Sequence, residues 1–244
     1  MKKPELIAHR GYTKHFPENT IVGIGAAIEA GARAVEFDIQ LTADQVPVLF
    51  HDPDMERVCG VKGAIHDFTL SQLQKFNASE PDRFGNDFEH TRIATLEEMV
   101  NMVMHHPQVQ LFVEIKRESV EKFGITTVLS QVHSALAPVR KRCVLISFDY
   151  KFLLAARRNN WAQIGVVLQR WSDRKHHIVK EIKPDYLFCN YKKLPLLRPL
   201  SKGRARLALY EIDDANLAMK LARRGADYIE TFSIGELLNA LSSR

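Results

Sequence analysis

"AVEFDIQL", residues 34–41, alternates apolar and polar side chains along a run rich in strand-forming residues. Successive side chains of a β-strand point to opposite faces, so this strand has one fully apolar face and one polar face. The apolar face is suited to packing under helices, and in a closed barrel the polar face looks toward the axis. The apolar face comprises Val35, Phe37, Ile39 and Leu41, and the polar face comprises Glu36, Asp38 and Gln40.

Similar short apolar runs alternate along the chain with segments of helical periodicity, which predicts repeated βα units around a parallel sheet. If residues 46–51 pair beside the strand at 34–41, eight repeats remain, and that number favours a closed TIM (β/α)8 barrel over an open doubly wound sheet. The expected strands are 5–9, 34–41, 46–51, 110–116, 143–148, 164–169, 186–190, 206–212 and 228–232, and the expected helices include 20–32, 95–106, 125–137, 150–160 and 214–226.

Residues 52–94 break this rhythm with scattered Pro, Gly and Asp residues. No interdomain linker or low-complexity segment separates them from the rest. The length of 244 residues suits one barrel as a single unit. We therefore expect one domain over residues 1–244, with a small lobe of about residues 52–94 inserted after the second barrel strand region.

A second strand, "QLFVEIK" at 110–116, turns Glu114 and Lys116 to the same inward face as Glu36 and Asp38. Carboxylates that converge on a barrel axis are costly unless a cation or hydrogen bonds compensate their charge. An oxygen-only set of ligands favours Mg²⁺ or Ca²⁺ over zinc. A buried ion-pair network without metal, in which Lys116 and Arg10 neutralise the carboxylates, explains the same pattern.

Two histidines follow predicted strands, His9 before Arg10 and Gly11, and His51 before Asp52. Barrel enzymes carry their active-site residues at the C-terminal ends of strands. A pair of histidines there can serve as general base and general acid near neutral pH. The remaining eight histidines fall in predicted helices or loops and are interpreted as surface residues.

The composition favours an anionic small molecule or a membrane surface as the binding partner and does not require nucleic acid. The net charge of +5 and the pI near 9.1 are mildly basic and favour an anionic substrate. Three widely spaced cysteines suggest neither a disulfide framework nor a zinc site. Without a secretory signal or an apolar run long enough to span a bilayer, we expect a soluble cytoplasmic protein with no membrane insertion. Its oligomeric state is not predicted.

The ordered motifs "HRG", "PENT", "EFDIQLTADQVPVLFHD", "TLEE", "VEIK" and "ISF" resemble those of the glycerophosphodiester phosphodiesterase family from residue 9 to about 148, and "GADYIET" extends the likeness weakly. The resemblance implies a TIM barrel that uses a divalent metal to hydrolyse glycerophosphodiesters to glycerol 3-phosphate and an alcohol. It implies His9 and His51 as the catalytic pair. It further implies Glu36, Asp38 and Glu114 as metal ligands, with Arg10 and Lys116 holding the phosphate.

Two segments depart from the family pattern. "LYEIDD" replaces a "WTVN"-like strand, which places Tyr210 at the tryptophan position and Asp213 at the asparagine position, and "YIETFSI" keeps Thr231 but replaces an aspartate with Phe232. Tyr210 is either a substrate contact or simply part of the barrel packing. Glu18 and Asn19 are expected to fix the first loop, with Asn19 or Thr20 as the helix N-cap.

Two other functions stay open at this point. A related phosphodiesterase could act on lysophospholipids at a membrane, with the basic stretch at 198–206 attracting anionic lipid. A catalytically silent barrel could instead bind glycerol phosphate. The complete set of histidines and carboxylates argues against the silent barrel, because a protein that only binds needs no paired acid and base.

Overall fold

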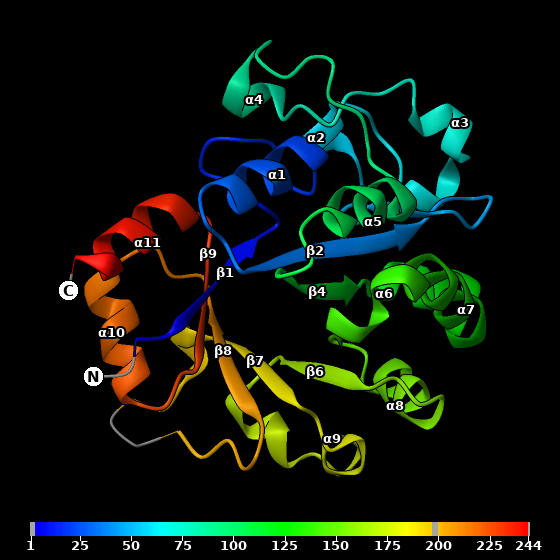
Figure 1. Cartoon of the computed structure of the whole chain (residues 1–244). Helices are drawn as coiled ribbons and strands as arrows, with labels where there is room; N and C mark the ends of the chain where they lie inside the picture. Colours follow the sequence, from blue (N-terminus) through cyan, green and yellow to red (C-terminus); the bar gives the residue numbers. More distant parts are fainter. Residues whose placement is uncertain (1–2, 197–199, 244) are drawn as a thin grey trace.

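The computed structural model describes residues 3–196 and 200–243, and its central feature is a closed parallel β-barrel (Figure 1). The parallel strands pair in the order β1-β9-β8-β7-β6-β5-β4-β2, and β1 also pairs with β2, which closes the ring. The predicted TIM barrel is therefore confirmed. Its strands are β1 (Glu5–His9), β2 (Ala34–Leu41), β4 (Gln110–Ile115), β5 (Cys143–Ser147), β6 (Gln163–Leu168), β7 (Tyr186–Asn190), β8 (Arg206–Tyr210) and β9 (Tyr228–Thr231).

Strand β3 (Pro47–Leu49) lies outside this ring. It pairs antiparallel with β2, so that Leu49 lies opposite Ile39 and Pro47 opposite Leu41. The chain thus turns back after β2 and returns along it toward the barrel mouth. The prediction that residues 46–51 pair beside the second strand is confirmed, although the strand itself is shorter.

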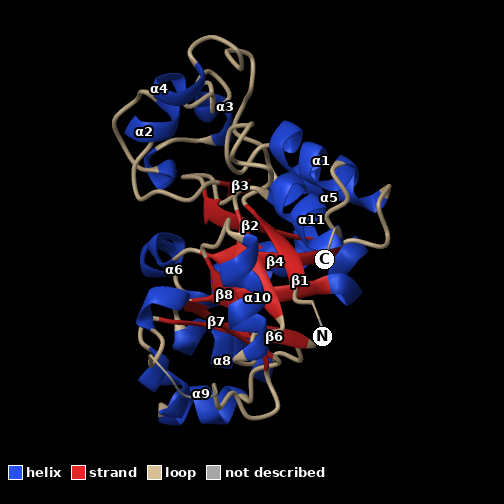
Figure 2. Ribbon diagram, turned by 90° about the vertical axis from the view of Figure 1, so that its left-hand side faces the viewer, coloured by secondary structure: helices blue, strands red, loops and turns tan. Residues whose placement is uncertain are grey.

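Helices surround the barrel and cover its apolar outer face (Figures 1 and 2). The outward side chains of β2 and β4 belong to the large core that these helices share with the sheet, as the alternation predicted. The surrounding helices are α1 (Ile21–Glu29), α5 (Leu96–Met104), α6 (Arg117–Phe123), α7 (Ile125–Leu136), α8 (Tyr150–Arg158), α9 (His177–Ile182), α10 (Ala215–Arg223) and α11 (Ile234–Ser242).

An aromatic layer fills the barrel interior below the mouth. The Phe112 ring meets those of Tyr186, Phe188 and Tyr228 edge to face, with centroids 5.2, 5.3 and 5.9 Å apart. Edge-to-face packing suits the quadrupoles of the rings, and burial of each large side chain contributes roughly 1.5–3 kcal/mol. The polar inward residues at the C-terminal strand ends therefore lie directly above a closely packed, buried aromatic layer.

Residues after β3 form a separate small lobe with its own apolar cluster, in which Met55, Ile65 and Leu73 are fully buried. Figure 2 shows this lobe projecting beyond the barrel. It contains α2 (Glu56–Cys59), a 3-10 turn (Ile65–Asp67), α3 (Leu70–Leu73) and α4 (Pro81–Phe84). Within residues 3–196 and 200–243, no helix combines the length and apolarity needed to cross a membrane.

The loop between β1 and α1 is held tightly against the helix it precedes. Thr20 is the N-cap, and its side chain accepts a hydrogen bond from the Gly23 amide at 3.0 Å. Gly11 has φ +94°, and a Cβ there would lie 2.7 Å from the backbone carbon of Gly23. Glycine is thus required at position 11 both by its backbone conformation and by the close approach of α1.

Candidate active site

His9 ends β1 and is almost completely buried at the barrel mouth. Its Nε2 lies 3.7 Å from a carboxylate oxygen of Glu36, and its ring stacks on Phe232 with centroids 4.8 Å apart. Burial, together with the positive charge of Arg10, lowers the pKa of His9 well below its ordinary value. The imidazole is therefore neutral near neutral pH and able to accept a proton.

His51 lies two residues after β3, and its side chain is about 30% exposed. The sequence interpretation placed it at a strand end of the barrel mouth, and the structure brings it there by a different route, because the antiparallel β3 returns the chain along β2. Its Nδ1 lies 2.7 Å from Oδ1 of Asp52. A carboxylate only accepts hydrogen bonds, so Nδ1 carries a proton and Nε2 is the nitrogen that can exchange one.

Asp52 and Arg57 tie this histidine to the rest of the site. Arg57 donates from Nε to Asp52 at 2.6 Å and from two nitrogens to Glu18 at 2.7 and 3.0 Å. Glu18 in turn pairs with Arg10 at 3.1 Å. Burial opposes ionisation of Asp52, but the hydrogen bonds from His51 and Arg57 outweigh it and hold its pKa below the usual range. The lobe thus fixes the orientation of His51 through one arginine.

Three inward carboxylates, Glu36, Asp38 and Glu114, meet as the strand pattern predicted. Each offers an oxygen, and these oxygens all lie within 4.8 Å of one another. Asp38 and Glu114 are paired across β2 and β4, and Glu36 stands beside His9 across β1 and β2. The pairing of β2 with β4 therefore brings together residues that are up to 78 positions apart in the chain.

Two cations accompany these carboxylates. Lys116 Nζ lies 2.9 Å from Glu114 and 3.4 Å from Asp38, and Arg10 Nε lies 3.2 Å from Asp38. Burial disfavours ionisation of Asp38, but Lys116 and Arg10 overcome it and hold the pKa of Asp38 below its usual range. Asn19 adds a hydrogen bond to Asp38 at 2.9 Å and so fixes the loop, while Thr20 provides the N-cap.

Glu36 is the carboxylate that these cations satisfy least. Burial, followed by the charges of Asp38 and Glu230, raises its pKa well above the ordinary value, and its Oε1 has no hydrogen-bond partner among the described residues. A divalent cation between Glu36, Asp38 and Glu114 would remove this penalty, and three carboxylates are the hard oxygen donors that Mg²⁺ and Ca²⁺ prefer. The residues present therefore fit such an ion.

The far wall of the site is apolar. A cavity of about 120 Å³ is lined on one side by His9, Arg10, Glu36, His51, Glu114, Lys116, Glu211 and Glu230, and on the other by Ile146, Phe148, Val167, Phe188 and Tyr210. Tyr210 is thus placed both to pack in the barrel and to face the cavity. Asp213 is not among the residues that line this cavity. It accepts hydrogen bonds from the Thr231 hydroxyl and from the backbone amides of Phe232 and Ser233.

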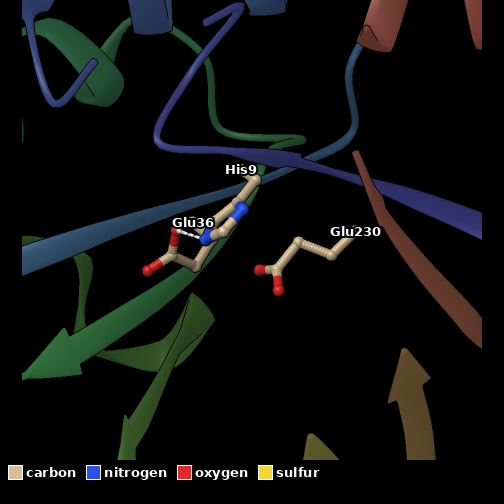
Figure 3. A group of neighbouring side chains, drawn as sticks. All are labelled: His9, Glu36 and Glu230. Atoms are coloured by element: carbon tan, nitrogen blue, oxygen red, sulfur yellow. Dashed lines mark ion pairs between the residues drawn. The ribbon is translucent and has the colours of Figure 1, made fainter. Parts of the chain in front are cut away.

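Sequence reasoning missed Glu230, which reaches into the same cavity from β9 (Figure 3). Its carboxylate, His9 and Glu36 each offer a ligand atom, and these lie within 4.8 Å of one another. Strand alternation applied to "YIET" at 228–231 would have turned Glu230 inward with Tyr228. In the expected strand at 228–232, the same alternation would also have placed Phe232, which stacks on His9, on this face.

The fold and the site together define a (β/α)8-barrel protein with paired histidines and clustered carboxylates at the C-terminal mouth, where barrel enzymes hold their active sites. The particular family follows from sequence. Residues 9–198 match the model of the Glycerophosphoryl diester phosphodiesterase family, and the chain belongs to this family.

Curated relatives carry the same name. The chain is 40% identical to mouse Glycerophosphodiester phosphodiesterase 1 over 167 residues, which are 68% of this chain and 49% of that protein. It is 28% identical to a Glycerophosphodiester phosphodiesterase of Caldanaerobacter subterraneus over 240 residues, or 97% of both chains. The chain spans about half the length of the mammalian relatives it matches.

Solved structures share the fold over nearly the whole chain. A phosphodiesterase of Oleispira antarctica, solved with its product sn-glycerol-3-phosphate, superposes with a TM-score of 0.86 and 22% identity, covering 98% of this chain and 97% of that one. A glycerophosphodiester phosphodiesterase of Thermotoga maritima gives a TM-score of 0.74 at 25% identity, with 99% of each chain covered.

Proposed function

We propose that this protein hydrolyses glycerophosphodiesters, releasing sn-glycerol 3-phosphate and an alcohol. The observation that carries the proposal is that His9, His51, Arg10 and Lys116 line one cavity together at the barrel mouth. A neutral buried base, a second oriented histidine and two fixed cations suit the transfer of a phosphoryl group. Membership of the family supports the same reaction.

The two histidines divide the proton transfers. His9, whose pKa is lowered by burial and by Arg10, takes the proton from the attacking hydroxyl as its oxygen bonds to phosphorus. His51, held by Asp52 through Nδ1, gives a proton from Nε2 to the alkoxide as the bond from phosphorus to the leaving oxygen breaks. The attacking hydroxyl belongs either to water or to the glycerol itself.

Arg10 and Lys116 stabilise the negative charge that builds on the phosphate oxygens, because both lie beside the cavity as permanent cations. Glu36, Asp38 and Glu114 are the proposed ligands of one divalent cation, Mg²⁺ or Ca²⁺. When bound, such a cation supplies further neutralisation of charge on the phosphate. Tyr210 is retained as a proposed substrate contact for the glycerol carbons.

The experiment is release of sn-glycerol 3-phosphate from glycerophosphocholine in the presence of Mg²⁺ or Ca²⁺. We expect His9→Ala and His51→Ala each to lower kcat by at least about 100-fold, as loss of a general acid or base does. His177→Ala, on an exposed histidine of α9, is the matched control and should leave kcat unchanged. Undiminished turnover in the two site variants would contradict the roles assigned to them.

The two alternatives predict different results. A silent binding barrel would bind sn-glycerol 3-phosphate without turning over any glycerophosphodiester. A phosphodiesterase acting on lysophospholipids at a membrane would need its mouth against the lipid, yet the described part of the basic stretch, residues 200–206, leads into the N-terminal end of β8, at the other end of the barrel. Residues 198 and 199 fall outside the described ranges, and Lys202 and Arg206 already bind Asp227 and Tyr228. We keep a cytoplasmic location as a proposal, supported by three free thiols.

A further inference from the structure

Glu230 is a buried acid that the proposed chemistry does not use. It lies on the inner face of β9, opposite Ile7 of β1, and only 3% of its surface is exposed. No ion pair involves Glu230 within the described part of the chain, and its Oε1 has no hydrogen-bond partner there. Figure 3 shows its side chain extending from β9 toward His9 and Glu36.

An unpaired carboxyl group at this depth is costly, because burial removes its water without providing a partner. Burial, followed by the negative charges of Glu114 and Asp38, raises the pKa of Glu230 well above its ordinary value. An apolar side chain would pack at this position without that cost, as Ile146 and Val167 do on the opposite wall. The fold therefore keeps at position 230 a polar group whose Oε1 no described residue satisfies.

The order of strands around the barrel indicates which ligand this is. β1 separates β9 from β2, so Glu230 lies on the other side of His9 from the carboxylates that would hold a cation. The close neighbours of Glu230 are His9 and Glu36. Asp38 and Glu114 form a separate group with Glu36, on the other side of His9 from Glu230. A hard cation beside Glu230 would have to take the imidazole of His9, which oxygen-preferring ions disfavour.

A hydroxyl group fits this position better than a metal ion. It can donate a hydrogen bond to one of the two groups and accept from the other, and Tyr210, on β8 next to β9, provides an apolar face beside it. We propose that Glu230 binds a hydroxyl group of the polyol that carries the phosphate, and so makes the site selective for polyol phosphates over simple alkyl phosphates. This inference rests on the proposed function and names a specificity residue for it.

A buried polar group discriminates strongly, because a ligand without the hydroxyl leaves it unsatisfied. The matching test compares sn-glycerol 3-phosphate with n-propyl phosphate, which has the same carbon chain and charge but no hydroxyl. Calorimetric titration with both ligands at saturating Mg²⁺ gives the preference as a ratio of dissociation constants. We expect the wild type to prefer sn-glycerol 3-phosphate by about 10- to 100-fold.

The variants separate hydrogen bonding from packing. Glu230→Leu removes the polar group at similar volume and should reduce the preference to less than about threefold without weakening n-propyl phosphate. Glu230→Gln keeps a donor and an acceptor and should retain most of the preference. Glu230→Met serves in place of the leucine variant if that variant does not fold, as judged by thermal denaturation.

Glu114→Gln is the matched control, since it alters a carboxylate in the same cavity that belongs to the proposed cation group. It should weaken Mg²⁺ and both phosphates together and leave the preference unchanged. The proposal is overturned if the wild type shows no preference, if Glu230→Leu keeps the wild-type ratio, or if Glu230→Leu weakens Mg²⁺ as much as Glu114→Gln does. The last result would make Glu230 a metal ligand.

Hydrolysis measured on the same samples separates this inference from the proposed function. A wild type that prefers sn-glycerol 3-phosphate but hydrolyses no glycerophosphodiester would refute the function and leave the role of Glu230 standing. A wild type that hydrolyses glycerophosphocholine while Glu230→Leu keeps its preference would refute the role of Glu230 alone.

Discussion

Replacing Asp52 with asparagine should prevent His51 from carrying protons on both ring nitrogens, the form that can donate from Nε2. Asp52 accepts from His51 Nδ1 at 2.7 Å and from Arg57 Nε and Nη2 at 2.6 and 3.0 Å. In Asp52→Asn, an NH2 group replaces one carboxylate oxygen, and this group donates hydrogen bonds instead of accepting them. Because Arg57 can only donate, the remaining oxygen turns toward it and the amide faces His51, which favours the tautomer with the proton on Nε2 and none on Nδ1.

A neutral imidazole held in that tautomer is a poor acid, and loss of general acid catalysis lowers rates by about 10²–10⁴-fold. The side chains of His51 and Asp52 are 30% and 19% exposed, so water partly replaces the lost contact. We therefore expect kcat/KM to fall by about 10²–10³-fold, or about 3–4 kcal/mol of transition-state stabilisation.

The assay is the initial rate of sn-glycerol 3-phosphate release, with the affinity for the product measured in parallel. Product affinity should stay within about threefold, because Arg10 and Lys116 are untouched. Asp54→Asn, at an exposed carboxylate two residues away, is the control and should behave like the wild type. A kcat/KM of Asp52→Asn within threefold of the wild type would refute the role of Asp52 in orienting His51.

Three further changes test the fold, the electrostatics and the cation group. Gly11→Ala should destabilise the protein by about 2–5 kcal/mol in urea denaturation, because it adds strain at positive φ to a clash with Gly23, whereas Gly60→Ala, at positive φ but in open space, should cost only about 1 kcal/mol. Glu230→Gln should raise Tm in a chelator-containing buffer, by about 2–4 °C for each kcal/mol gained. The raised pKa of Glu230 means that its stabilising protonated form is fully present below the ordinary value of 4.5 and is lost as pH rises through the raised pKa, so the gain should grow with pH and vanish near pH 4. Asp38→Asn should weaken Mg²⁺ binding in calorimetry by at least about tenfold.

Each of these predictions has a contradictory outcome. Equal losses of stability in Gly11→Ala and Gly60→Ala would show that the approach of α1 imposes no constraint. A Tm difference for Glu230→Gln that does not change between pH 4 and pH 8 would show that its carboxyl group titrates normally. Unchanged Mg²⁺ affinity in Asp38→Asn would remove Asp38 from the proposed ligands.

Much of the barrel and of its carboxylate cluster could be predicted because strand alternation is a local rule. In "AVEFDIQL" and "QLFVEIK" the period of two extends over enough residues to separate an apolar face from a charged one, and the faces predicted for Val35 and Glu114 are those observed. In "YIET" each face carries one apolar or aromatic and one polar residue, so alternation does not single out a charged face, and Glu230 was missed for that reason.

Other features depend on contacts that no local pattern encodes. The contact between Glu18 and Arg57 joins residues 39 positions apart, and it exists only because the lobe folds back over the first loop. Likewise, the antiparallel return of β3, not the strand alone, brings His51 to the mouth. The choice between Asn19 and Thr20 as N-cap was settled by tertiary contact, since Asn19 is engaged by Asp38.

We propose above all that the protein hydrolyses glycerophosphodiesters in the cavity lined by His9 and His51. The most direct test of this claim is the release of sn-glycerol 3-phosphate from glycerophosphocholine by the purified protein with Mg²⁺ or Ca²⁺. We predict steady release that falls by at least about 100-fold in His9→Ala and persists in His177→Ala. Absence of release from glycerophosphocholine, glycerophosphoethanolamine and glycerophosphoglycerol with either metal would contradict the claim.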